Sequence, residues 1–467
     1  MRLTLSLSLS LCASLLAMPR EADAADTAFD SSDNLKIFSG TAEDDIPASV
    51  AMRNWGFQDE VFFVYERFEH PDLGSDEDRR LYVKGYTCSD DDVCATQSAD
   101  WAETQIGTLL RFNQGIQPAV AIRRSGGKTI LHIAARQMIY GNCDQDFVAY
   151  DEEEDEDDDS IKNVDLAEIV WDTDDGEGST RAIDKNDAIS GCEDRGIPSI
   201  KYRSSQPYAC WTGKPINNAD EEIRCGTRST GGDWDAYGAI NNSGFNNEHA
   251  TFTFDTTTGT DRFVAYTKRN GAGASSYRIK GTFADRANDP TVTFAGDNND
   301  KVDFPTTMLR DDMLYLAWAE DFNNSTATIE ISECDTVADD CEDVGGGEWT
   351  TTEVAAVSEA KHPEIRSDGD RQFVIFEADY EYDTNLFARR IYFTERCVGS
   401  GWTTPVVIRE PDTSSWHQGI NLGRIHLALN RQENLVHVAW VEWELGMGGV
   451  PDDGDIWWAW AEYDDCS

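Results

Sequence analysis

The sequence predicts an all-β fold, a seven-bladed β-propeller, and three observations lead to this prediction. Apolar and polar residues alternate with period two along most of the chain, and helical periodicity is nearly absent. A pattern of strands recurs, as in "FPTTMLRDDMLYLAWAED" and "HPEIRSDGDRQFVIFEAD". The aromatic residue that ends its second strand returns every 52 to 76 residues, a spacing typical of four-stranded propeller blades.

The N-terminal 24 residues have the features of a secretory signal peptide. Arg2 is followed by a Leu/Ser/Ala-rich stretch and by the small-residue exit Ala22-Asp23-Ala24. We therefore expect cleavage before Ala25, one propeller domain over residues 25–467, and a secreted or periplasmic monomer. No later stretch is long and apolar enough to span a bilayer.

The net charge of −49 limits the classes of partner. Such a surface repels nucleic acid and anionic membranes, and it favours cations or cationic partners if it does more than keep the protein soluble. We expect a glycan or an extracellular protein as ligand.

The seven blades are aligned on the residue that ends the second strand of each. The aligned residues are Tyr65, Ala135 as an exception, Trp211, Tyr266, Trp318, Phe376 and Trp440. Inner strands come before them and often follow a proline, as in "PASVAMR" and "PEIR". Third strands come after them, as in "RRLYVKGY" and, for blade two, "DFVAY".

Blade seven has only three strands after residue 424. The run "NLKIFSG", residues 34–40, is not used by any other blade. We expect it to pair antiparallel with residues 455–462, which would cover the Trp-rich terminal edge and close the ring.

Ten cysteines remain after the signal peptide, and an even number in an exported chain favours disulfides. The expected blade positions suggest five pairs, of which the last follows only by elimination: Cys88–Cys94, Cys334–Cys341, Cys210–Cys225, Cys397–Cys466 and Cys143–Cys192.

Two features of the sequence are expected on the face of the ring opposite the channel mouth. The acidic run "DEEEDEDDD", residues 151–159, should follow the third strand of blade two and form a solvated loop on the face opposite the channel mouth. The arginines that finish the inner strands recur regularly, which indicates blade architecture; they are Arg53, Arg123, Arg203, Arg310, Arg366 and Arg431.

The loops after the second strands should surround the mouth of the central channel. Their carboxylates and aromatic rings suit a sugar, because rings stack on its apolar face and carboxylates accept its hydroxyl protons. The same composition also fits an ordinary ring of polar loops. The candidate ligand-binding residues are Glu66, Arg67, Arg136, Tyr140, Lys268, Asp321, Phe322, Asp379, Tyr380, Tyr382 and Trp443.

Candidates for catalysis lie at the same face. Two carboxylates at a suitable separation could cleave a glycoside, and the candidates are Glu320, Glu377 and Glu442. His249 and His362 begin the inner strands of blades four and six, so either could serve as a base, for example in a lyase. His132 and His437 share one position in the repeat, which points to packing.

Calcium is the cofactor that the loops could hold. Oxygen ligands cluster at "AGDNNDKVD", where the candidate ligands are Asp297, Asp300 and Asp303. The runs from Asp172 and from Asp452 are similar, and none has the spacing of an EF-hand.

The fourth strands carry a resemblance to a known family. The segments "STGGDW", "VGGGEW" and "CVGSGW" resemble degenerate Asp-boxes of sialidase-like (BNR) propellers, with the motif glycine and tryptophan kept and the aspartate replaced. This resemblance implies a secreted propeller, and the Asp-box itself is a structural turn. Sialidases have six blades and an arginine triad, which we cannot match here; some related seven-bladed propellers are polysaccharide lyases that use His, Tyr and Arg.

Three functional hypotheses remain open. The first is a non-enzymatic propeller that binds a glycan or a protein at the mouth. The alternative is a carbohydrate-active enzyme, either a glycoside hydrolase or a polysaccharide lyase. The third is an adhesion or scaffold module, and the fold alone does not choose among them.

Overall fold

The structure is a computed structural model, and its described part is built from β-strands without a helix. It describes residues 27–29, 35–39, 45–54, 60–69, 78–89, 93–96, 104–105, 115–125, 128–137, 164–172, 177–184, 198–203, 206–213, 222–228, 234–236, 246–254, 262–269, 277–283, 292–296, 301–322, 326–337, 341, 347–383, 386–409, 421–422, 425–445 and 451–466.

The strands form seven antiparallel sheets, which we number in chain order. Sheet 1 consists of β2 (Asp45–Asn54), β3 (Glu60–Glu69), β4 (Asp78–Ser89) and β5 (Val93–Thr96), with β6 (Thr104–Gln105) also on β4. Sheet 2 consists of β7 (Gly115–Ser125), β8 (Lys128–Gln137), β9 (Val164–Asp172) and β10 (Glu177–Asp184). Sheet 3 consists of β11 (Ser199–Arg203), β12 (Gln206–Gly213), β13 (Glu222–Arg228) and β14 (Trp234–Ala236).

The next three sheets repeat the same order. Sheet 4 consists of β15 (Asn246–Phe254), β16 (Arg262–Arg269), β17 (Tyr277–Phe283) and β18 (Val292–Ala295). Sheet 5 consists of β19 (Val302–Arg310), β20 (Met313–Glu320), β21 (Thr328–Asp335) and β22 (Thr350–Ala356). Sheet 6 consists of β23 (Ala360–Ser367), β24 (Arg371–Asp383), β25 (Leu386–Cys397) and β26 (Val406–Arg409).

Sheet 7 joins the two ends of the chain. It consists of β28 (His426–Asn430), β29 (Leu435–Leu445), β30 (Pro451–Glu462) and β1 (Leu35–Ser39), with β27 (Asn421–Leu422) also on β29. β1 is antiparallel to β30, and its register runs from Leu35 opposite Trp458 to Ser39 opposite Asp455. The expected antiparallel pairing with the Trp-rich edge is therefore present, over residues 455–458 of the expected 455–462.

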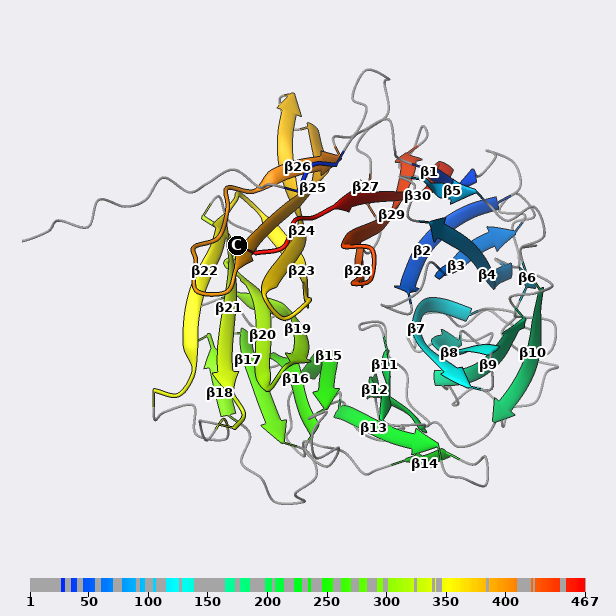
Figure 1. The fold of residues 1–467 in the computed structure, drawn as a ribbon, viewed down its shortest axis with the longest axis horizontal. Helices are drawn as coiled ribbons and strands as arrows, with labels where there is room; N and C mark the ends of the chain where they lie inside the picture. The colour runs from blue at the N-terminus through cyan, green and yellow to red at the C-terminus, as the bar shows by residue number, and fades with distance from the viewer. Residues whose placement is uncertain are drawn as a thin grey trace, which may run out of the picture.

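The sheets stand around a common centre, as the blades of a β-propeller do (Figure 1). No single sheet closes on itself, but the first strands of consecutive sheets contact one another in a complete circuit: β2, β7, β11, β15, β19, β23, β28 and again β2. The contact of β28 with β2 closes the circuit, and β1 and β30, from opposite ends of the chain, pair in the seventh sheet.

The aromatic residues of the repeat fill the core between the sheets. Each of those whose side chain is described is buried: Tyr65, Trp211, Tyr266, Trp318, Phe376 and Trp440. His132 and His437 are buried too, as their shared position in the repeat predicts. The repeat is thus a packing pattern, with the aromatic side chain as its largest apolar contribution.

Sheet 2 corrects one expectation. Its third strand is β9, which pairs with β8 from Arg136 opposite Val164 to Thr129 opposite Trp171. The segment "DFVAY" is not that strand, and the acidic run 151–159 comes before the third strand instead of after it. In chain order the run therefore stands between the second and third strands of sheet 2, and it lies outside the described residues.

The inner strands also begin earlier than expected. β19 and β23 start three residues before Pro305 and Pro363, so each proline lies inside the strand and not before it. The register shifts at these prolines, which marks a β-bulge. A bulge suits proline because the residue needs no ladder hydrogen bond there.

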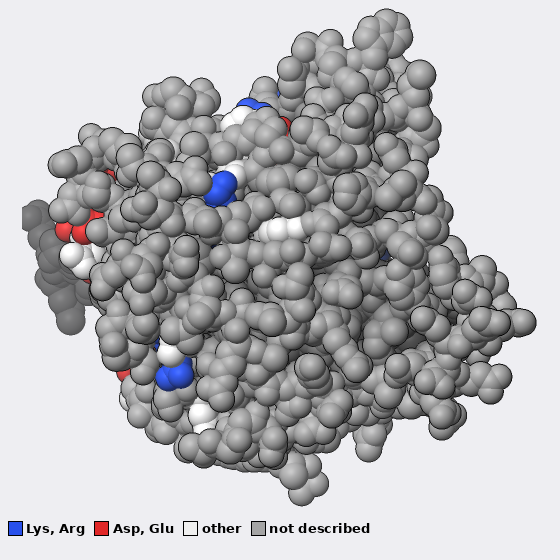
Figure 2. Space-filling view, turned by 90° about the vertical axis from the view of Figure 1, so that its right-hand side faces the viewer, with Lys and Arg blue, Asp and Glu red and all other residues white. Residues whose placement is uncertain are grey.

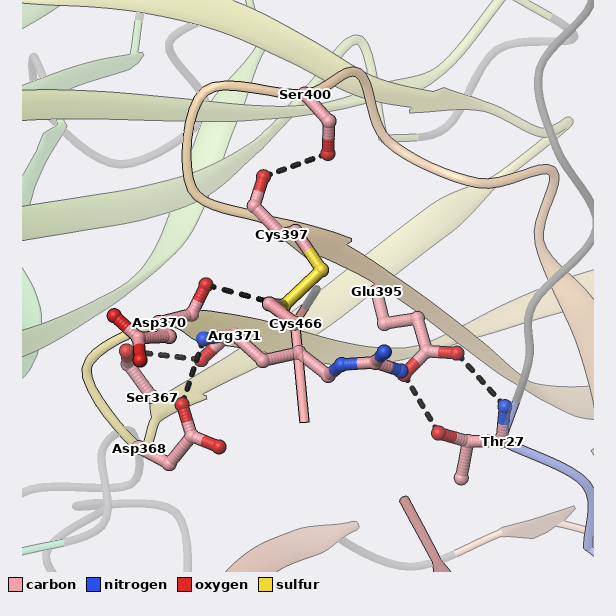
Figure 3. Close-up of a disulfide and its surroundings, with 9 residues drawn as sticks. All are labelled: Thr27, Ser367, Asp368, Asp370, Arg371, Glu395, Cys397, Ser400 and Cys466. Atoms are coloured by element: carbon pink, nitrogen blue, oxygen red, sulfur yellow. Dashed lines mark hydrogen bonds and ion pairs between the residues drawn. A yellow bond between two sulfur atoms is a disulfide. The ribbon is translucent and has the colours of Figure 1, made fainter. Parts of the chain in front are cut away.

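Three of the expected disulfides are present: Cys210–Cys225, Cys334–Cys341 and Cys397–Cys466. The pairs Cys88–Cys94 and Cys143–Cys192 lie outside the described side chains. Cys397–Cys466 attaches the C-terminal segment to β25 (Figure 3). In the described residues there is no helix with the length and apolarity that a membrane crossing requires.

Two arginines of the inner-strand series confirm the architectural interpretation. Arg310 of sheet 5 donates to the carbonyl oxygen of Asp368 at 3.1 Å, and Arg431 of sheet 7 donates to that of Ser367 at 3.1 Å. Both acceptors lie at the β23–β24 turn of sheet 6. These two arginines therefore connect neighbouring sheets.

Candidate functional site

In each of sheets 4, 5 and 6 the inner strand has a β-bulge near its start. One residue with an aromatic or imidazole side chain lies at each bulge. The register shifts between Glu248 and Thr251, between Asp303 and Thr306, and between Lys361 and Glu364. The first bulged residues have φ values of 53°, 58° and 52°; they are His249, Phe304 and His362. A positive φ is unusual for such bulky residues, and strained positions of this kind concentrate at functional sites.

The three rings form a row. The ring centroids of His249 and Phe304 are 5.0 Å apart, and those of Phe304 and His362 are 3.9 Å apart. Phe322, which follows the second strand of sheet 5, packs edge-on against Phe304 at 5.3 Å. Two imidazoles from different sheets therefore flank one aromatic ring.

His249 is held by a buried carboxylate. Its Nδ1 lies 2.7 Å from Oδ1 of Asp303, whose side chain is 5% exposed. The same oxygen accepts hydrogen bonds from the Thr267 hydroxyl at 2.6 Å and from the Phe304 N–H at 2.7 Å. Burial by itself would raise the pKa of Asp303, but His249 and these two donors outweigh it and lower the pKa.

His362 has the same arrangement with a different carboxylate. Its Nδ1 is hydrogen-bonded to Oε1 of Glu377, and the imidazole is 34% exposed while the carboxylate is 1% exposed. Arg389 Nη1 lies 3.6 Å from the same carboxylate oxygen. A carboxylate bound to Nδ1 fixes the tautomer and leaves Nε2 as the nitrogen that can exchange a proton with a ligand.

Two cations border this second pair. Lys361 Nζ lies 2.6 Å from Oδ2 of Asp379, and Arg389 Nε lies 2.8 Å from its Oδ1. Burial would raise the pKa of Asp379, but Lys361 and Arg389 outweigh it and lower the pKa. Asp379 therefore holds both cations beside the His362–Glu377 pair as a carboxylate.

Glu442 and Glu320 have different surroundings. Both oxygens of Glu442 accept from Arg409, at 2.5 and 3.0 Å, and Oε1 also accepts from Trp440 Nε1 at 2.9 Å. This pairing connects sheets 6 and 7 and engages the whole carboxylate. Glu320 lies near Glu330, and burial, followed by the charges of Glu320 and Glu353, raises the pKa of Glu330 to about 7.

The remaining candidates divide into described and undescribed side chains. Lys268 stands opposite Arg278 across β16 and β17, and burial followed by Arg278 lowers its pKa. Asp321 follows β20 with φ of 53°. The side chains outside the described set are Glu66, Arg67, Arg136, Tyr140, Asp297, Asp300, Tyr380, Tyr382 and Trp443.

Of the three expected calcium ligands, only Asp303 lies in the described part of the chain. Asp297 and Asp300 lie outside it. Asp303 Oδ1 is engaged by His249, Thr267 and Phe304. Among the described residues, no group of three or more His, Cys, Asp or Glu side chains could hold a metal ion.

Three residues of the site were not among the sequence candidates: Phe304, Lys361 and Arg389. A signal for Phe304 exists, since "FPTTMLR" and "HPEIR" share a ring-bearing residue before proline at the start of the inner strand. Lys361 precedes His362 in the same motif. The sequence gives no local indication that Arg389 belongs to the site, because β25 carries several arginines. Only the tertiary structure shows that Arg389 is the one beside Glu377.

Comparisons with known proteins found no matching family model and no matching curated protein. Among solved structures, the chain is similar to the polysaccharide lyase Uly1, with 10% identity and a TM-score of 0.48 over 92% of this chain and 99% of that one. It is also similar to an α-L-arabinanase from Penicillium chrysogenum, with 11% identity and a TM-score of 0.43 over 75% and 94%. A thermostable family-43 glycoside hydrolase gives 10% identity and a TM-score of 0.37 over 62% and 96%. Similarity at this level assigns no activity.

Proposed function

We propose that the protein is an exported carbohydrate-active enzyme that uses histidine acid–base chemistry at the mouth of its ring. The observation that carries the proposal is the row His249–Phe304–His362, with each imidazole held at Nδ1 by a buried carboxylate. We further propose that the seven sheets are the blades of one seven-bladed propeller of residues 25–467, released by removal of residues 1–24. The likeness of its fourth strands to sialidase-like repeats belongs to the same proposal.

His362 is the proposed base. The Glu377 carboxylate orients the imidazole and stabilises the imidazolium that forms when Nε2 takes a proton. His249 is the proposed partner acid, because Asp303 holds it in the same way on the other side of Phe304. Phe304 would serve as the surface on which a sugar ring stacks.

A lyase fits these groups better than a hydrolase. Hydrolysis of a glycoside uses two carboxyl groups that face the scissile bond. Here Glu377 is engaged by His362, and Glu442 is engaged by Arg409. In a β-elimination the base removes the proton next to the uronate carboxyl group, a C=C bond forms, and the C–O bond breaks as the acid protonates the leaving oxygen. Lys361 and Arg389, which Asp379 holds beside the base, are the proposed partners of the uronate carboxylate.

The test is incubation of the purified mature protein with neutral and uronate-containing polysaccharides. Ultraviolet absorbance of the new unsaturated product and new reducing ends are both measured. We expect both signals on a uronate polymer, and His362→Asn should lower the rate about 10²- to 10⁴-fold. New reducing ends without absorbance would favour a hydrolase, and binding without cleavage would restore the hypothesis of a non-enzymatic glycan-binding propeller.

A further inference from the structure

The contact between sheet 7 and sheet 1 is where the ring closes, and it contains a titratable group that the mouth site does not use. Sheet 7 lies beside sheet 1 (Figure 1), and β2 of sheet 1 contacts β28, β29 and β30 of sheet 7. We call this contact the closing seam. The titratable group is His437 on β29, which is 0% exposed.

His437 lies in apolar surroundings. Side chains alternate between the two faces of a strand, so His437 shares a face with Ala439. Ala439 packs in one core cluster with Val50 and Met52 of sheet 1, so this face of sheet 7 is the one at the closing seam. The imidazole centroid is 5.7 Å from the ring centroid of Trp458. Among the residues that the structure describes, neither ring nitrogen of His437 has a hydrogen-bond partner.

The same position of the repeat has a partner in sheet 2. His132 of β8 is also buried, but its Nδ1 is hydrogen-bonded to the Tyr202 hydroxyl of sheet 3. Tyr202 stands one residue before the arginine that finishes its inner strand, and Met52 has that place in sheet 1. Met52 has no hydroxyl, and its thioether is only a weak acceptor. The imidazole at the closing seam therefore lacks the hydrogen bond that its counterpart makes.

Among the described side chains, none at the closing seam pairs with a positively charged His437. Sheet 1 contributes three phenols, which are neutral below about pH 10, and one ammonium; these are Tyr65, Tyr82, Tyr86 and Lys84. On its own face of sheet 7 stand His426, which lies 3.6 Å from Glu364 of sheet 6, and Glu462, which is exposed. Burial alone lowers the pKa of His437 to about 3.

A charge that is enclosed without a partner is costly, so it favours any state in which water reaches it. Figure 2 shows described charged side chains as separate spots at the surface, where water solvates their charge. His437 has no such access while the closing seam is intact. We propose that the closing seam is an acid-sensitive switch, in which protonation of His437 separates sheet 7 from sheet 1 while the other sheets stay folded.

The pH range of the switch follows from the two states of the imidazole. In the open seam His437 is exposed to water and has its ordinary pKa of 6.5. Between this value and about 3 the open state binds more protons than the closed state. The closed seam is therefore fully stable above pH 6.5 and loses stability as the pH falls. From pH 7 to pH 5 the open fraction should rise about 10- to 30-fold.

Oxidation of a buried methionine measures the opening. The purified protein is treated with dilute hydrogen peroxide at pH 7 and at pH 5, and sulfoxide formation is followed by peptide mass spectrometry. Met52 is 0% exposed at the closing seam, so it should be oxidised about 10- to 30-fold faster at pH 5. Met308 of sheet 5, which is also buried, should keep its rate.

Substitutions identify the responsible group. His437→Phe should remove the acceleration at Met52, and His437→Leu, with a smaller side chain, should do the same if the phenyl ring does not fit. The matched control is His132→Phe, which changes the same repeat position between sheets 2 and 3 and should keep the acceleration. The proposal is overturned if Met52 is oxidised equally at both pH values or if both His437 variants respond as the parent does. It is also overturned if Met308 is accelerated as much as Met52, which would indicate unfolding of the whole ring.

Discussion

Sheet 6 contains two buried glutamates with opposite roles, and the contrast shows what distinguishes a site from a support. Glu377 on β24 is 1% exposed and Glu395 on β25 is 2% exposed. Burial does not separate them. What separates them is the kind of group that each carboxylate holds.

Glu395 binds groups that do not exchange protons with a ligand. It accepts from the Thr27 N–H at 2.8 Å, from the Thr27 hydroxyl at 2.6 Å and from Arg371 Nη1 at 2.9 Å (Figure 3). Phe29 packs on Phe393 of the same strand, and the Cys397–Cys466 disulfide lies two residues further along it. Both ends of the chain are therefore fastened to sheet 6.

Glu377 instead holds an imidazole that remains about one-third exposed. A titratable ring oriented by a buried carboxylate can exchange protons with a ligand, whereas a backbone N–H cannot. A buried carboxylate thus indicates a site only when its partner is titratable and accessible.

The largest effect should come from removal of the N-terminal segment. Deleting residues 25–40 removes β1 and the Thr27–Glu395 contacts and exposes the strand edge at Trp457 and Trp458. We expect a loss on the order of 5 kcal/mol or more in the free energy of unfolding, or failure to fold. Urea denaturation of the two chains measures it. Equal stability of the truncated protein would show that the termini do not close the ring.

Glu377→Gln should separate the two glutamates by activity. The amide cannot stabilise an imidazolium, so the rate on the substrate found in the polysaccharide screen should fall about 10²- to 10⁴-fold. The matched control, Glu395→Gln, should keep the rate per folded molecule and lose about 3–5 kcal/mol of stability, because Arg371 loses its buried partner. If both variants lose activity equally, the distinction between them is not functional.

The terminal disulfide gives a smaller effect on stability alone. Cys466→Ser opens a bridge that spans 69 residues, and we expect a loss of about 2–4 kcal/mol by chemical denaturation. Cys341→Ser opens a bridge that spans 7 residues and should cost less, since the shorter loop restricts the unfolded chain less. A larger loss from Cys341→Ser would contradict the view that fastening the C-terminus matters.

The smallest effect concerns pH and Glu330. Its pKa is raised in the folded state to about 7 from an ordinary 4.5, so between these values the folded protein binds more protons than the unfolded one. Stability contributed by this group is complete below pH 4.5 and declines as pH rises towards 7. Glu330→Gln should flatten that decline and be more stable than the parent above pH 7, as thermal unfolding at several pH values would show. An unchanged pH profile would show that Glu330 titrates normally.

Several features of the fold were accessible from the sequence because they are local or covalent. Alternation and the recurrent aromatic residue predicted the strand pattern, and the seven sheets of the structure follow it. The closing strand followed from a count of strands, and three disulfides followed from cysteines on neighbouring strands or in one short loop. His249 and His362 were recognised as candidates because each stands near the start of an inner strand.

The partners of those histidines depended on the tertiary structure. Asp303 and His249 belong to different sheets, and Glu377 reaches His362 from the adjacent strand, so neither contact is encoded in a local pattern. The third strand of sheet 2 shows the same limit. "DFVAY" and residues 164–172 both have a strand-like composition, and only hydrogen bonding to β8 selected the second. The sequence determined which segments could be strands and where the termini would meet; the packing of one sheet on the next decided which charges face each other, because those contacts join residues far apart in the chain.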